Sequence, residues 1–249
     1  MPLLVNGERI DLARPTGDLI RAHPHLEEKA KVLRSQPARV VEPKGLLYVQ
    51  QREFAVTTPR DGSVSILGSD DATTCHIVVL RHTGAFHLQP DELHLVTFCV
   101  TQLNDREEKD IHFPIIYGIA VNVKTAEIFP ATFPEKGPDK DLRSAHVLTG
   151  ATLTNVYDTK TEQLHIGPYF WRPFPYVDFW LEQDDEQILQ NLSTSPLAEP
   201  PHFVSHIRST LTFLKEHPFP SRSLFPDRKP RIYKKNEEGL WEQVCSDKI

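Results

Sequence analysis

The chain has 249 residues, of which 39% are hydrophobic and 25% charged, as in an ordinary globular protein with one large core or two small ones. Its formal net charge of −6 argues against nucleic acid as a partner. The apolar run at residues 93–100 is short and contains His94, so it does not resemble a membrane span. We therefore expect neither nucleic acid nor a membrane as a partner.

Three cysteines, Cys75, Cys99 and Cys245, are scattered along the chain, and their odd number does not suit a disulfide framework. The N-terminus lacks a basic flank followed by an apolar stretch, which is the pattern of a secretory signal. These features predict a cytoplasmic protein.

The first predicted element is helical. Thr16 is a suitable N-cap for apolar residues that recur near the helical period as far as Leu33. Pro24 should break or kink this segment, because proline cannot donate the backbone hydrogen bond that a helix interior requires.

From Gly45 onward the pattern changes to that of short strands bounded by turn residues. Some of these runs are almost continuously apolar, which is typical of strands at the centre of a sheet. The short strands are predicted at residues 46–49, 54–57 and 64–67, and the central strands at 75–80, 93–101 and 115–123. Residues 153–157 and 163–166 flank Asp158 as a predicted hairpin.

Two helices are predicted near the end of the chain. The acidic residues 184–186 suit the first turn of a short helix through Leu192, where they face the positive end of the helix dipole. Residues 200–201, both proline, open a longer helix whose apolar residues keep a helical spacing until Pro218.

Strands grouped in the middle of the chain, with helices on both sides, predict an α+β fold rather than alternating strand–helix units. We expect one domain over residues 1–249. Its parts are an N-terminal helical segment (1–44), a β-rich core (45–180), a C-terminal helical segment (181–218) and a tail (219–249).

Cys75 is the residue whose position most suggests chemistry. It stands between a polar loop, residues 69–74, and the apolar run 77–80. A cysteine at such a junction can stay partly exposed on a rigid backbone, as a thiolate nucleophile requires. Position alone leaves a second interpretation equally open, that Cys75 is a small core residue, because free cysteine is among the most buried residue types.

Several segments, taken in order, resemble the N-terminal asparagine amidohydrolases of the N-degron pathway: residues 1–5, 45–51, 67–75, 117–122, 177–180 and 192–203. The resemblance covers nearly the whole chain. It implies hydrolysis of the side-chain amide of N-terminal asparagine in proteins and peptides, giving aspartate and ammonia. It also implies an α-β-β sandwich of the cysteine deamidase type, and we expect a monomer that uses no cofactor or metal.

Carried over onto this sequence, the resemblance makes Cys75 the nucleophile. It makes Ser69, six positions earlier, the hydroxyl that orients a histidine. In such a site a thiolate attacks the amide carbon, while an imidazole takes the thiol proton and then protonates the departing ammonia. Without the resemblance, Ser69 is better explained as a turn residue after Gly68.

The chain departs from the family pattern after Gly84, where several dozen residues are missing before the pattern resumes at Leu93. The family's catalytic histidine and part of its sheet are expected to be among them. His87 is the candidate substitute because it lies in a free loop, although a lone loop histidine is usually only solvated. His76 and His82 have the wrong strand parity to face Cys75. The alternative function is therefore a catalytically impaired or inactive variant that at most binds peptide N-termini.

Three acidic residues, Asp70, Asp71 and Glu53, are candidates for binding the substrate α-ammonium through charge-assisted hydrogen bonds, although acidic loop residues are usually only exposed. His202 and His206 share a helix face, but they lack cysteine or acidic ligands at the usual spacing. The sequence therefore predicts no metal site.

Overall fold

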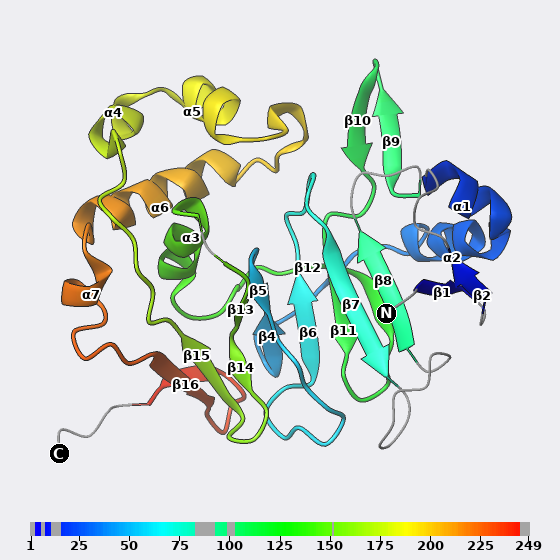
Figure 1. Ribbon diagram of the computed structural model, residues 1–249, viewed down its shortest axis with the longest axis horizontal. Helices are drawn as coiled ribbons and strands as arrows, with labels where there is room; N and C mark the ends of the chain where they lie inside the picture. The colour runs from blue at the N-terminus through cyan, green and yellow to red at the C-terminus, as the bar shows by residue number, and fades with distance from the viewer. Residues whose placement is uncertain are drawn as a thin grey trace.

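A computed structural model describes residues 3–5, 8–10, 16–82, 93–98, 103–150 and 152–244 (Figure 1). Within them the chain forms a mixed fold of several sheets and helices, which confirms the α+β prediction. The candidate His87, the two other cysteines and the shortened segment around His87 lie outside the described residues.

The central sheet has five strands in the order β3-β12-β11-β6-β4. β3 pairs parallel with β12 and β4 pairs parallel with β6, while β11 pairs antiparallel with both of its neighbours. The strands are β3 (Arg39–Val40), β4 (Leu46–Tyr48), β6 (Ile66–Ser69), β11 (Ile119–Asn122) and β12 (Ile128–Thr132).

Both faces of this sheet are buried, as alternate residues of β4 show. Leu46 and Tyr48 join one hydrophobic cluster with Phe129, whereas Leu47 joins a second cluster on the other face. Successive side chains of a strand point to opposite faces, so a strand buried on both sides is apolar at every position. All three residues of β4 are buried.

A second, antiparallel sheet has four strands in the order β14-β15-β16-β17. Its strands are β14 (Tyr157–Asp158), β15 (Gln163–Ile166), β16 (Arg231–Lys235) and β17 (Trp241–Gln243). Tyr157 pairs with Leu164, which confirms the predicted hairpin around Asp158. The predicted tail is not an appendage, because β16 pairs with β15 along its length.

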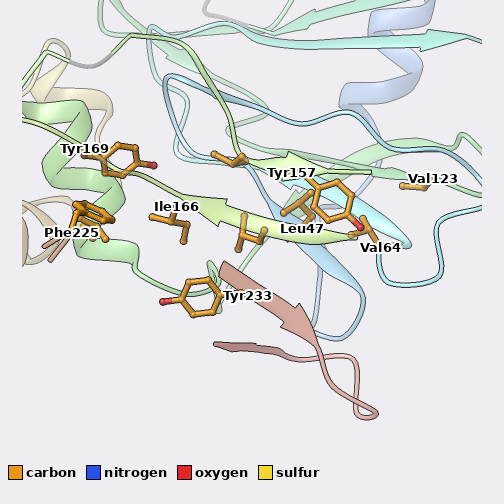
Figure 2. Close-up of a cluster of buried hydrophobic side chains, with 11 residues drawn as sticks. Leu47, Val64, Val123, Tyr157, Ile166, Tyr169, Phe225 and Tyr233 are labelled. Carbon is orange, nitrogen blue, oxygen red and sulfur yellow. The ribbon is translucent and has the colours of Figure 1, made fainter. Parts of the chain in front are cut away.

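The largest hydrophobic cluster lies between these two sheets. It joins Leu47 from the central sheet to Ile166 and Tyr233 from the second sheet. Figure 2 shows Tyr169 and Phe225 at one end of the cluster and Val123 at the other, with Leu47 and Tyr157 between them. The second sheet therefore packs against the face of the central sheet that carries Leu47.

The prediction that residues 75–80 and 93–101 form central strands is wrong. Within the part of the chain that the structure describes, β7 (Ile77–His82) and β8 (Leu93–Phe98) pair only with each other. Val78 and Leu80 are 56% and 65% exposed, whereas Ile77 and Val79 pack against buried residues of the core. A continuous apolar run therefore does not require that both faces of a strand be buried. The predicted strand at 115–123 is also shorter, because only β11 forms there.

The remaining strands form small two-stranded sheets. These pairs are β1 (Leu3–Val5) with β2 (Glu8–Ile10), β5 (Glu53–Phe54) with β13 (Thr154–Asn155), and β9 (Asp105–Glu108) with β10 (Ile111–Pro114).

The helices begin and end at local signals in the sequence. Pro24 separates α1 (Thr16–Ala22) from α2 (Pro24–Arg34), as predicted. The Asp184 side chain caps the predicted short helix by accepting a hydrogen bond from the Gln187 backbone N–H at 2.8 Å. The other helices are α3 (Lys140–Leu148), α4 (Val177–Glu182), α5 (Asp185–Leu192), α6 (Phe203–Glu216) and α7 (Pro220–Ser223), with a 3-10 turn at Pro196–Ala198.

The longest of these helices, α6, lies beside α3 and α5 at one end of the central sheet (Figure 1). α3 was not predicted from the sequence. No helix among the described residues has both the length and the apolar character needed to cross a lipid bilayer.

Candidate functional site

The loop that carries Cys75 connects β6 to β7, and contacts on several sides fix its shape. Asp71 has a left-handed backbone with φ of 58°, and the next residue donates its N–H to the Tyr117 carbonyl at 3.0 Å. Thr73 is buried. The Thr74 hydroxyl lies 3.1 Å from that of Thr194. Cys75 is thus a half-buried thiol on a fixed backbone, just before β7 rather than within it.

A cavity of about 280 Å³ opens beside this loop, and we call it the Cys75 cavity. Its walls come from the end of β4, the Cys75 loop, helix α3 and the segment that leads from α5 into α6. The groups that carry chemistry in its lining are Gln50, Gln51, Asp70, Asp71, Cys75, Lys136, Lys140, Ser144, Glu199, His202 and His206.

Among the described residues, one side chain makes a polar contact with the Cys75 thiol. Gln51 Nε2 lies 3.2 Å from Sγ. Burial raises the pKa of the Cys75 thiol, the nearby charge of Glu199 raises it further, and Arg52 opposes both effects. The resting state is therefore the thiol, so a reaction at Cys75 requires a base to remove its proton.

A charge cluster, largely buried, lines the same cavity. Lys136 forms salt bridges with Asp70, at 2.6 Å, and with Asp71. The Asp70 side chain is only 8% exposed, and it also accepts hydrogen bonds from the Tyr48 hydroxyl at 2.7 Å and from the Phe133 N–H at 3.1 Å. The candidate ligand Asp70 is therefore already bound on both of its oxygens by protein donors.

Asp71 is the more open of the two carboxylates. Burial alone raises its pKa, but the charge and hydrogen bond of Lys136, with a further hydrogen bond from His202, lower the pKa below its ordinary value. His202 Nε2 lies 2.9 Å from Asp71 Oδ2. Asp71 is thus an ionised carboxylate that contacts an imidazole.

Two histidines, His202 and His206, line the Cys75 cavity, and neither was predicted to do so from the sequence. His202 precedes α6 and is exposed, whereas His206 lies one turn further along, with its Nε2 3.1 Å from the Ser144 hydroxyl. The only sequence signal was their shared helix face, which we weighed as a metal site. Among the described residues, no group of three or more His, Cys, Asp or Glu side chains is arranged to hold a metal.

The structure places Glu53 behind the cavity rather than in it. Both carboxylate oxygens accept hydrogen bonds from Arg143, at 2.9 and 2.5 Å, and one also accepts from the Gln50 N–H at 2.8 Å. The Glu53 and Arg143 side chains are 3% and 1% exposed. This pair links β5 to α3, and Glu53 is not available to a substrate ammonium in this arrangement.

Ser69 is the last residue of β6 and pairs with Ile119 of β11. It is half-buried and is not one of the residues that line the Cys75 cavity. Glu199, which sequence reasoning missed, does line it. Burial and the charge of Asp71 raise the pKa of Glu199, although a hydrogen bond from Ser193 at 2.5 Å opposes them.

An α+β fold that places a half-buried thiol in a cavity with imidazole and carboxylate groups has the components of a thiol-dependent hydrolase. Comparison with known proteins identifies the family. The chain belongs to the protein N-terminal asparagine amidohydrolases, because the model of that family matches residues 36–85 and 84–243.

The relatives carry the same name. The chain is 55% identical to the protein N-terminal asparagine amidohydrolase of Sus scrofa and 53% identical to that of Homo sapiens. Both alignments run over 307 residues and cover 99% of this chain and 99% of the relative. The enzyme of that name from Arabidopsis thaliana is 27% identical over 282 residues, covering 79% of this chain and 80% of the relative.

Proposed function

We propose that this chain hydrolyses the side-chain amide of N-terminal asparagine in proteins or peptides, with Cys75 as the nucleophile. The observation that carries the proposal is the position of Cys75, half-buried on a fixed loop at a cavity of about 280 Å³. The family and the names of the relatives support the choice of substrate.

The proposed reaction has two halves. The Cys75 sulfur forms a bond to the amide carbon of the substrate side chain, the carbon–nitrogen bond breaks, and the thiol proton leaves on ammonia. Water then adds to the resulting thioester, the carbon–sulfur bond breaks, and the thiol is restored as the aspartate side chain departs. Gln51 Nε2, 3.2 Å from Sγ, holds the sulfur in place.

Selectivity for a chain terminus requires a group that binds the α-ammonium. Among the described residues no cation forms an ion pair with Glu199, whereas Asp70 and Asp71 share Lys136. A bound ammonium would stabilise the charged form of Glu199, which burial disfavours. We therefore assign the α-ammonium to Glu199 rather than to Asp70, Asp71 or Glu53.

We also propose the finer fold, an α-β-β sandwich of the cysteine deamidase type that lacks an internal segment after Gly84. The two matches to the family model meet at residues 84–85, and alignments of 307 residues are longer than this chain of 249. The missing segment would contain the histidine that Ser69 orients in related deamidases. Ser69 and His87 keep their predicted roles as proposals.

The chain would act as a monomer in the cytoplasm, at the start of the N-degron pathway. The scattered cysteines support the cytoplasmic location, and the resemblance to the family supports the pathway. The inactive, peptide-binding alternative is not favoured, because each relative named above carries the name of an enzyme.

The test is ammonia release from a short peptide that begins with asparagine. We expect turnover with this peptide and none with peptides that begin with glutamine or with acetylated asparagine. Cys75→Ala should abolish it, and an alkylating reagent should label Cys75 before Cys99. Turnover that survives Cys75→Ala would show that the nucleophile is assigned wrongly, and no release from any peptide would overturn the proposed activity.

A further inference from the structure

The Cys75 cavity contains an imidazole–carboxylate pair that the proposed function has not used. His202 Nε2 lies 2.9 Å from Asp71 Oδ2, and Lys136 binds the same carboxylate from the other side. The His202 side chain is 52% exposed, so one edge of its ring is held and the other is accessible. His202 and Cys75 both line the cavity, and Glu199 lies near enough to influence each of them electrostatically.

We propose that His202, oriented by Asp71, is the acid–base group that serves Cys75 in this chain. The inference rests on the proposed function, because it assigns the proton transfers of that reaction. It assigns to His202, which lines the Cys75 cavity, the role for which the sequence alone offered His87.

The hydrogen bond to Asp71 determines which ring nitrogen can act. An ionised carboxylate only accepts hydrogen bonds, so Nε2 carries the proton and Nδ1 is left with a free lone pair. Nδ1 takes the proton from the Cys75 thiol as sulfur bonds to the amide carbon, and then gives it to the nitrogen that leaves as ammonia. In the second half it takes a proton from water and returns it to sulfur, so that no proton is gained or lost overall.

His206 is the competing histidine, and its surroundings favour a structural role. Its Nε2 lies 3.1 Å from the Ser144 hydroxyl, and its buried Nδ1 has no hydrogen-bond partner among the described residues. Burial, with the charge of Lys140, lowers the pKa of His206 to about 4. A group with such a pKa binds a proton too weakly near neutral pH to be an effective general base.

The experiment compares His202→Gln with His217→Gln, which makes the same substitution at the other end of α6 and outside the cavity. We expect His202→Gln to lower kcat for the asparagine peptide by about 10²-fold or more while KM changes little, because a positioned acid–base group contributes about 10²–10⁴-fold. His217→Gln should keep wild-type kcat. In His202→Ala, added imidazole should restore part of the rate, which a purely structural role does not predict.

A second readout does not depend on turnover. The rate at which iodoacetamide alkylates Cys75 is measured from pH 6 to 9, and His202→Gln should slow it near neutral pH while His217→Gln leaves it unchanged. If the wild-type chain releases no ammonia but His202→Gln slows alkylation, the proposed function fails and the pairing stands. The inference is overturned if His202→Gln keeps full kcat, or if it lowers kcat no more than His206→Gln does. It is also overturned if Cys75 of His202→Gln is alkylated at the wild-type rate.

Discussion

Replacing Arg143 by methionine tests how firmly α3, which lines the cavity, is held to β4 and β5. The guanidinium binds both oxygens of Glu53, at 2.9 and 2.5 Å, and it also donates to two backbone carbonyls. These are Tyr48 O at 2.7 Å and Lys136 O at 3.2 Å. One side chain therefore joins β4, β5, α3 and the segment that carries Lys136.

The expected loss follows from what the substitution leaves behind. Methionine fills much of the same volume but leaves the Glu53 carboxylate, 3% exposed, with the Gln50 N–H as its remaining donor. Removing one partner of a buried ion pair costs about 3–5 kcal/mol. The two carbonyls that lose their donor add to this, at about 1–3 kcal/mol for each buried group left unsatisfied, although such costs overlap. We expect a loss near the upper end, about 4–5 kcal/mol.

The assay is urea unfolding followed by circular dichroism, with free energies of unfolding compared at equal pH and salt. The double variant Arg143→Met/Glu53→Met is the informative control, because it removes both charges together. We expect it to be more stable than Arg143→Met alone, since no uncompensated charge remains buried. A loss below about 1 kcal/mol in the single variant, or a double variant less stable than the single one, would refute the reasoning.

Three further changes test other parts of the structure. Burial lowers the pKa of His206 from 6.5 to about 4, so its contribution to stability is complete above pH 6.5 and is lost as the pH falls toward 4. His206→Gln should therefore reduce the drop in unfolding free energy between pH 7 and pH 4.5 by roughly 2 kcal/mol. A drop equal to that of the wild-type chain would contradict this. Gly118→Ala would place a Cβ 2.3 Å from Asp70 Cβ and 2.7 Å from the Ala131 carbonyl oxygen, so we expect a clear fall in Tm, and an unchanged Tm would show that the backbone can move aside. Tyr157→Phe removes a 2.8 Å hydrogen bond to buried Asp61, so urea unfolding should show a loss of about 2 kcal/mol in the free energy of unfolding. An unchanged free energy of unfolding would show that this hydrogen bond does not stabilise the fold.

Local signals in the sequence were sufficient for several elements. Pro24 begins the second of two helices because proline is tolerated in the first turn of a helix but not in its interior. Asp184 caps α5 because its side chain satisfies a free backbone N–H. The hairpin at Asp158 was likewise predictable from turn residues between two short strands. In each case the determining contacts lie within a few residues of one another.

Elements whose character depends on distant partners were not predictable in this way. α3 was missed because Arg143, a charged residue, occupies a core position that only its pairing with Glu53 makes tolerable. Residues 219–249 were taken for a tail because β15, the partner strand of β16, is far away in the sequence. β7 was taken for a central strand because the sequence does not tell which apolar face is covered.

The residues of the candidate site also differ in whether local sequence could reveal them. Cys75 could be singled out from its neighbours alone, because the change from polar loop to apolar strand is local. His202 and Glu199 could not, because the fold brings them to the thiol from the segment before α6. Ser69 was placed by resemblance, and its role stays a prediction.

The outer edge of β4 is protected against pairing with another molecule. β4 is an edge strand of the central sheet, yet its backbone is not open to another chain. The Trp241 indole N–H donates to the Leu46 carbonyl at 3.0 Å, Arg143 donates to the Tyr48 carbonyl, and the Gly45 N–H donates to the Gly239 carbonyl at 3.1 Å. Exposed edge strands are templates for pairing between molecules, and native proteins cover them. Here two side chains and the β16–β17 turn provide the cover, so a molecule clipped before Gly239 would expose a hydrophobic strand edge and would be expected to self-associate.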